Sequence, residues 1–226
     1  MAIAVIANTA AGSTTGDNVT TGAINTTGAN FLVLVVASLD NTGVTISDSK
    51  ANTWTPRTNR VGTPDLQVYD ANATGTAIVG TGHTFTATST AQMPALAVIA
   101  FSGVATAAIF DVENGTSFAG VASVQPGSVT PTVNNEVLVT GLSNDVAQLG
   151  PTIDTGFTRS DFVDFVATLT NGVAMAYKIQ TTAGAENPTW SWTFASNGAV
   201  SMATFKAAVA AAGTRQTPSL GLVGVQ

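Results

Sequence analysis

Few residues of this 226-residue chain have the types and spacings that catalysis requires. His83 is the single histidine, so a Ser-His-Asp arrangement would have to use it, yet no Gly-x-Ser-x-Gly turn is present. Two carboxylate pairs, Asp111/Glu113 and Asp161/Asp164, have the residue types of a glycosidase acid and base. Such pairs usually come from different strands, and charges on exposed strands and loops are far more common. We therefore expect His83 to be an exposed residue at a strand end, and we predict that the protein is not an enzyme.

Calcium is the only metal that the sequence suggests. Asp40-Asn41, the segment Asp48 to Asn52, and Asn144-Asp145 supply oxygen ligands from expected loops, although the spacing of an EF-hand is missing. Asp and Asn are also ordinary turn residues. We therefore predict no metal site and no cofactor, and keep a structural calcium ion as an open alternative.

Aromatic residues raise the possibility of carbohydrate binding. In Trp190-Ser-Trp-Thr-Phe194 the alternation places Trp190, Trp192 and Phe194 on one face of a strand. Packing in a core is the simpler role for them and for Trp54. If a glycan platform exists, Trp54 and Trp192 are our candidates for it.

Composition excludes other classes of function. Charged residues make up 9% of the chain, against about 25% in an average soluble protein, and the net charge is −6. Seven lysines and arginines against thirteen acidic residues cannot neutralise a row of phosphates, so we expect no nucleic-acid partner. The absence of cysteine rules out disulfides and thiolate metal sites. The most apolar stretches, Phe31–Ala37 and Pro94–Phe101, are too short to span a bilayer as helices, so we expect no membrane partner.

Any such site would have to be positioned by strands. Short β-branched or aromatic runs, separated by Gly, Asn, Asp, Ser and Pro, recur about every ten residues, and helical periodicity is nearly absent. The expected strands are Ile3–Ala7, Asn18–Ala23, Phe31–Leu39, Thr45–Ser47, Trp54–Arg60, Asp65–Ala71, His83–Ala87, Ala95–Ser102, Ser117–Ala122, Val129–Thr132, Glu136–Leu142, Phe157–Phe165, Ala174–Thr181, Thr189–Ala195 and Val200–Lys206.

The two halves of the chain resemble each other. Asn30–Ser38 aligns with Asn135–Ser143, and four further segments repeat at offsets of about 103–108 residues, longer than the period of a solenoid. These are Trp54–Arg57 with Phe157–Ser160, Leu66–Ala71 with Ala174–Ile179, His83–Thr88 with Thr189–Phe194, and Ala97–Phe101 with Val200–Phe205. We predict pseudo-repeats over about 18–105 and 125–206.

The link between the repeats does not look like a free linker. Residues 103–127 include Ile109, Phe110, Val112 and Phe118, which favour burial. We therefore predict one domain over residues 1–212, whose halves interleave. The expected fold is an all-β, jelly-roll-like antiparallel β-sandwich built from an internal duplication, with a C-terminal extension.

The extension, residues 213–226, is unusually apolar for a tail. Two roles are open for this C-terminal arm: packing on its own sandwich, or adding to a neighbouring subunit. Its expected assembly contacts are Leu220, Leu222, Val223 and Val225, and the N-terminal segment Ile3–Ile6 is a second candidate.

Several motifs together are the basis of a resemblance to known proteins. In chain order they are Gly28-Ala-Asn-Phe-Leu-Val-Leu-Val-Val36, Asp48-Ser-Lys-Ala-Asn-Thr-Trp54, Phe101-Ser-Gly-Val104, Asp111-Val and the second Asn-Glu-Val-Leu-Val strand. Over about residues 1–206 the chain resembles a β-sandwich module of phage virion and bacterial surface structural proteins. The resemblance implies a module displayed on a particle or cell surface, with no catalytic residues to carry over.

The expected function follows from this resemblance and from the surface. No lysine or arginine precedes the short apolar start, so we read Met1–Ile6 as a first strand and not as an export signal. We therefore expect a virion protein assembled in the host cytoplasm. Its expected role is that of a non-enzymatic capsid decoration (cement) protein or tail component that forms a homo-oligomer and binds the major capsid or tail protein. The alternative is a carbohydrate-binding attachment module on a virion or cell surface.

Overall fold

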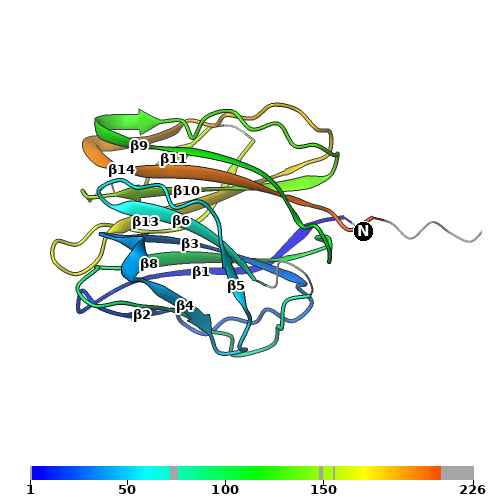
Figure 1. Cartoon of the computed structure of the whole chain (residues 1–226), viewed down its shortest axis with the longest axis horizontal. Coiled ribbons are helices and arrows are strands. Elements are labelled where there is room, and N and C mark those ends of the chain that lie inside the picture. Colours follow the sequence, from blue (N-terminus) through cyan, green and yellow to red (C-terminus); the bar gives the residue numbers. More distant parts are fainter. Residues whose placement is uncertain (1, 72–75, 148–149, 155, 210–226) are drawn as a thin grey trace, which may run out of the picture.

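The structure is a computed structural model that describes residues 2–71, 76–147, 150–154 and 156–209. The expected all-β antiparallel sandwich is confirmed, since every ladder between strands is antiparallel (Figure 1). The expected arm contacts Leu220, Leu222, Val223 and Val225 lie outside the described residues.

The first half of the chain forms two sheets. A five-stranded sheet has the order β1-β8-β3-β6-β5, with β1 (Ala4–Gly12), β8 (Ala95–Ser102), β3 (Phe31–Ser38), β6 (Asp65–Ala71) and β5 (Trp54–Pro56). A three-stranded sheet, β2 (Val19–Thr20), β7 (Phe85–Thr88) and β4 (Thr45–Asp48), covers one face of it. A single 3-10 turn, η1 (Asn41–Gly43), follows β3.

The second half forms one six-stranded sheet. Its main order is β11-β14-β10-β13-β12, with β9 also paired to β14. The strands are β9 (Phe110–Val124), β10 (Glu136–Asn144), β11 (Thr152–Ile153), β12 (Thr158–Val163), β13 (Gly172–Gln180) and β14 (Trp190–Lys206). In Figure 1 this sheet lies above the five-stranded sheet, and the three-stranded sheet lies below it.

Three stacked layers explain why β3 is apolar at nearly every position. Its odd-numbered residues, such as Val33 and Val35, face the six-stranded sheet, and its even-numbered residues, such as Leu32 and Leu34, face the three-stranded sheet. A strand covered on both faces has no solvent-facing side, so it does not alternate with polar residues.

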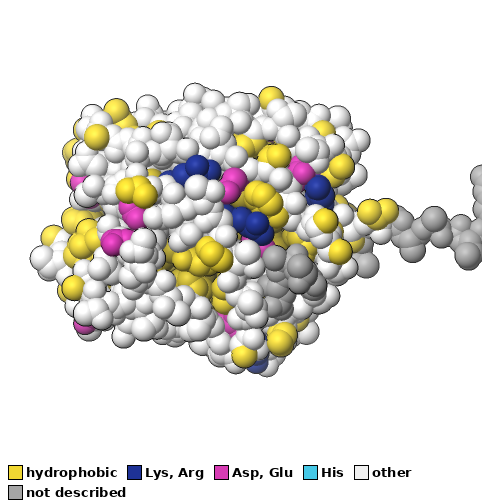
Figure 2. Space-filling model, viewed as in Figure 1, with side chains coloured by type: hydrophobic (Ala, Val, Ile, Leu, Met, Phe, Trp, Pro, Cys, Tyr) yellow, Lys and Arg dark blue, Asp and Glu magenta, His cyan; other side chains and the backbone are white. Residues whose placement is uncertain are grey.

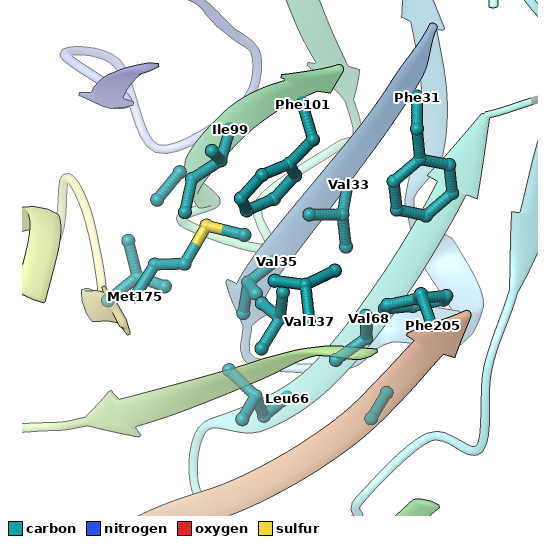
Figure 3. Close-up of a cluster of buried hydrophobic side chains, with 14 of the residues drawn as sticks. Phe31, Val33, Val35, Leu66, Val68, Ile99, Phe101, Val137, Met175 and Phe205 are labelled. Atoms are coloured by element: carbon teal, nitrogen blue, oxygen red, sulfur yellow. The ribbon is translucent and has the colours of Figure 1, made fainter. Parts of the chain in front are cut away.

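The main core lies between the two large sheets. Figure 3 shows Phe31 and Phe205 facing each other from β3 and β14, with ring centroids 4.8 Å apart. Gly141 on β10 allows the sheets to approach, because a Cβ there would lie 2.5 Å from Cγ1 of Val35. Burial of this apolar surface is the main force that holds the two halves together.

The repeated segments of the sequence occupy equivalent places in the two large sheets. In each sheet the strand that follows the Asn motif, β3 or β10, lies between two strands that are aligned in the repeats. These are β6 and β8 in the first half, and β13 and the end of β14 in the second. The alignment fails at one pair: β7 belongs to the small sheet, whereas Trp190–Phe194 is the beginning of the 17-residue strand β14. Two strands expected at Thr189–Ala195 and Val200–Lys206 are therefore one.

The link between the halves is itself a strand. β9 pairs along β14 and carries Phe110, Val112 and Phe118, which are half-buried, while Ile109 just before it is fully buried. The expectation of interleaved halves was wrong at the level of the sheets, since each large sheet takes all its strands from one half. The halves instead pack face to face through a shared core.

Polar side-chain interactions also connect the two halves of the chain. Arg57, after β5, pairs with the buried Asp70 of β6 and lies over the ring of Phe110 on β9, 4.0 Å from its centroid. The hydroxyl of Thr58 donates to Glu113 of β9 at 2.5 Å. In the described part of the chain, no helix is long and apolar enough to cross a membrane.

Candidate functional site

The candidate site is an apolar groove at the end of the sandwich where β1 begins and β14 ends. Its volume is about 670 Å³. We call it the terminal groove; its walls are Ala2, Ile3, Ala105, Ala107, Ala108, Val133, Asn134, Asn135, Ile179, Thr181 and Lys206–Val209. It continues the core between the two large sheets, since Ile3, Ala105 and Ala207 also contact that core. The core is therefore open to solvent at this end.

Backbone hydrogen bonds build the groove from distant parts of the chain. Beyond β14, Ala207 N donates to Asn135 O at 3.0 Å, and Ala208 N donates to Gly103 O at 2.8 Å. Ala105 N donates to Lys206 O at 2.8 Å on the other side. These bonds hold the end of β14 between the corner after β8 and the loop before β10.

The Phe101-Ser-Gly-Val104 corner is shaped for this packing. Gly103 has φ +75, and a Cβ there would lie 2.2 Å from Ala2 O, so only glycine fits. The side chain of Asn30 holds the next residue: its Nδ2 donates to Val104 O at 2.6 Å, and Val104 N donates to its Oδ1 at 3.3 Å. These two motifs of the sequence therefore shape one wall of the groove.

A cluster of charged groups supports the opposite wall. Both the backbone N and the hydroxyl of Thr132 donate to Asp111 at 2.6 Å, and Lys206 Nζ lies 3.0 Å from the same carboxylate. Thr132 directly precedes Val133, so Asp111 positions the loop that carries this groove residue. Glu136, fully buried at the start of β10, adjoins Asp111.

The two carboxyl groups of this cluster differ in acidity. Burial raises the pKa of Glu136 to about 7, and the nearby Asp111 carboxylate acts in the same direction. Burial alone would raise the pKa of Asp111, but hydrogen bonds from Thr132, Lys206 and Glu136 lower it to about 2. Asp111 is therefore charged at neutral pH, whereas Glu136 is protonated below about pH 7.

His83 is not the exposed residue that the sequence suggested. Its ring is fully buried, stacked on Phe85, with Nδ1 2.9 Å from the hydroxyl of Thr26 and Nε2 3.1 Å from Asp48. Burial lowers the pKa of His83. No local pattern in the sequence indicated this contact, because Asp48 lies 35 residues away.

Asp48 holds the Asp-Ser-x-x-Asn-x-Trp turn together. Its carboxylate accepts from Lys50 N at 2.7 Å and from Trp54 Nε1 at 2.7 Å, in addition to its contact with His83. Asn52 extends the turn by bonding Ile78 N and O. These residues form a hydrogen-bonded network that holds the turn in place.

The paired carboxylates have similar structural roles. Asp111 and Glu113 tie β9 to neighbouring segments, as described above, and Asp161 and Asp164 each accept from the next residue's backbone N.

The calcium candidates do not meet at one place. Asp40 caps η1 through Thr42, and Asn41 is buried with bonds to Ser38 and Asn59. Asp145 accepts from Asn197 in the second half. Within the described ranges, no group of three or more His, Cys, Asp or Glu side chains is arranged to hold a metal ion.

The two candidate glycan residues differ in their surroundings. Trp54 is held by Asp48 and packs edge-on to Phe85 in the core of the first half. Trp192 is half-buried, and its ring centroid lies 5.2 Å from that of Phe118. Phe194, two residues further along β14, is 54% exposed, whereas Trp190 is fully buried. A face of β14 therefore changes from core to surface along its length.

The residues of the N-terminal segment Ile3–Ile6, the second candidate for assembly contacts, differ in their exposure. Ile3 is 7% exposed and belongs to the main core, so its side chain is not a free contact, although it lines the groove. Ile6 is 38% exposed, at an irregularity in the pairing of β1 with β8.

The comparisons with known proteins show no family for this chain. No family model and no curated protein matches it. Among solved structures, a conserved protein of unknown function from Pseudomonas aeruginosa PAO1, PA5104, aligns over 92% of this chain and 100% of its own, with 8% identity and a TM-score of 0.30. A likeness this weak carries no argument about fold or function.

Proposed function

We propose that the chain is a non-enzymatic structural protein of a phage particle, a capsid decoration (cement) protein or a tail component. It acts by associating with copies of itself and by binding the major capsid or tail protein of a virion assembled in the host cytoplasm. The observation that carries the proposal is the terminal groove, an open apolar end of the core. Exposed apolar surface of this kind marks a site of protein association.

The distribution of charge supports the proposal. Four of the cations are already in ion pairs, Arg57 with Asp70, Arg60 with Glu113, Lys178 with Glu186, and Lys206 with Asp111. Figure 2 shows a face dominated by uncharged polar groups, with basic and acidic side chains lying side by side. Because charged residues make up only 9% of the chain, few charged groups would lose water when subunits meet, which lowers the cost of a permanent interface.

The hydrogen bonds of the polar residues that could act in catalysis also support a non-enzymatic role. His83, Asp48 and Asp111 each spend their hydrogen-bonding capacity on holding loops and strands in place. A catalytic acid or base needs a polar group that faces a substrate cleft.

Truncation of the chain tests the proposal. Removal of residues 214–226 should leave a folded sandwich, seen by the emission of buried Trp190, that no longer assembles in sedimentation and no longer enters particles. Val166→Asp, at an exposed site on a loop, serves as a control that should assemble normally. A full chain that stays monomeric at all concentrations and never copurifies with particles would contradict the proposal.

A carbohydrate-binding attachment module is the second candidate, favoured by Trp192, Phe118 and the exposed Phe194. Glycan-array binding that disappears in Trp192→Ala would support it. Trp54 packs in the core, so Trp54→Ala should lower the stability of the protein without a specific loss of glycan binding. Comparison of the two variants shows which tryptophan contacts the glycan.

A further inference from the structure

We propose that the terminal groove of one subunit binds the segment Leu220–Val225 of a neighbouring copy. This inference deepens the proposed self-association and rests on it, because it names the two surfaces that meet. The groove belongs to the described structure, and the segment follows from the sequence after Val209.

The walls of the groove are suited to binding bulky apolar side chains. Six of the wall residues are alanines, whose small side chains leave the space open: Ala2, Ala105, Ala107, Ala108, Ala207 and Ala208. Val133 and Ile179 remain 44% and 38% exposed at its sides. Its volume of about 670 Å³ lies within the range of about 300–1,000 Å³ that is typical of ligand pockets.

The segment after Val209 has the complementary chemistry. Among its 17 residues only Arg215 is charged, and the large apolar residues are Leu220, Leu222, Val223 and Val225. Pro218 and the glycines between these residues disfavour a helix, so an extended peptide is expected. Residues spaced two apart then point to the same side and can enter a groove together.

A neighbouring copy is the donor because of how the chain leaves the groove. Residues 206–209 already form one wall, with Ala207 and Ala208 bonded to Asn135 and Gly103. Val209 is 94% exposed, so the chain reaches solvent at this point. To fill its own groove the chain would have to reverse and lie along its own exit path. A neighbour's segment enters without that reversal.

The reach of the chain fits an exchange between subunits. The ten residues from 210 to 219 span at most about 33–36 Å when extended. A stretch of this length is long enough for Leu220 to contact an adjacent subunit. If two subunits exchange segments, the contact closes as a two-fold dimer; if each subunit gives its segment to the next, repetition forms rings or filaments.

The absence of native cysteine permits a direct test. Full-length Val133→Cys, in the groove wall, is mixed with full-length Leu222→Cys under mild oxidation, and the covalent heterodimer is measured by intact mass. The control is Val166→Cys with Leu222→Cys, because Val166 is 48% exposed and lies beyond the opposite end of β13. We expect the groove pair to crosslink at least about tenfold faster, since binding raises the effective concentration.

A second variant tests whether the faster crosslinking depends on the apolar groove. Ile179→Lys, added to the Val133→Cys chain, should bring the groove pair down to the control rate while tryptophan emission stays native. Equal rates for the groove and control pairs would overturn the inference. A chain that carries both Val133→Cys and Leu222→Cys distinguishes the two donors. A disulfide that forms only within this double variant would also overturn the inference, because the segment would then fill its own groove.

Sedimentation of the same samples separates the inference from the proposed function. If the chains assemble but the groove pair shows no preference, the groove and segment are not the contact, and self-association stands. If the full chain is monomeric throughout, the proposed function itself fails.

Discussion

Replacement of Glu136 by glutamine should change how the stability of the protein depends on pH. Glu136 is fully buried at the start of β10, beside the Asp111 carboxylate that holds Thr132 and Lys206. Glutamine retains a side-chain N–H that can donate to Asp111, but it cannot ionise. The variant therefore removes the titration and preserves the contact.

The sign and size of the effect follow from the pKa of Glu136. An unfolded carboxyl of this type ionises near 4.5, whereas burial raises the pKa of Glu136 in the folded protein to about 7. Between these values the folded state holds a proton that the unfolded state has released. The free energy of unfolding therefore falls as pH rises from about 4.5 to about 7, and then stays lower. The full difference corresponds to about 3 kcal/mol, at about 1.4 kcal/mol for each pKa unit.

Urea unfolding at pH 5, 6, 7 and 8, followed by tryptophan fluorescence, measures this contribution. Glu136→Gln and the natural chain should be close in stability at pH 5, and the variant should be the more stable by up to about 3 kcal/mol at pH 8. The contribution of His83 has the opposite slope, but it is present in both chains and cancels in the difference. Glu186→Gln, at a surface pair with Lys178, is the control and should keep the natural profile. A difference between Glu136→Gln and the natural chain that is the same at pH 5 and pH 8 would refute the reasoning.

Three further substitutions or titrations test the packing. In an NMR titration the only histidine, His83, should titrate below pH 6.5 because burial lowers its pKa, and stability should fall as pH drops below 6.5. A ring that titrates at 6.5 or above would contradict its described burial. Gly141→Val should destabilise by about 1–3 kcal/mol in thermal unfolding, because a Cβ at position 141 would lie 2.5 Å from Cγ1 of Val35. Val35→Ala in the same chain should restore part of the loss. Arg57→Ala should lower the free energy of unfolding in urea by about 3–5 kcal/mol, because it leaves Asp70 buried without its cation. Asp70→Asn in the Arg57→Ala chain should reduce this loss of stability. If the losses from the two substitutions simply add, the pair is uncoupled.

Strands with turn residues close to both ends were the easiest to predict. Asp65–Ala71 and Ala95–Ser102 were expected with the bounds that β6 and β8 have. Their punctuation by turn residues is local, so the sequence shows it directly. Val129–Thr132 was expected as a strand but forms only an isolated bridge, from Val129 to Glu186, and the short β11 was missed.

Long strands were harder to predict. Residues 196–199 were expected to separate two strands, yet β14 passes through them because β9 continues to pair along it, with shifts in register. A pairing partner more than 70 residues away gives no local signal. For the same reason the alignment of the halves was misleading at β7, where the local pattern of a strand is correct but its sheet is different.

The candidate site depended even more on tertiary contacts. The Asn30 and Phe101-Ser-Gly-Val104 motifs were visible in the sequence, but their meeting at the groove was not. Glu136 was taken only as part of a strand motif, because its acidity depends on burial and on Asp111, 25 residues before it in the chain. Alternation had placed Trp190 and Trp192 together, and the structure shows how far each is covered.

The sequence by itself determined the class of the fold, because turn residues and the spacing of apolar side chains act over a few positions and need no distant partner. It also determined the low charge of the chain and the repetition of its strands. Only the tertiary structure decided that the halves form separate sheets around one core, that His83 and Asp48 meet inside the first half, and that the core stays open at the end of β14. Each of these depends on which surfaces come together after folding, and burial and pKa values are properties of that packing rather than of any single segment.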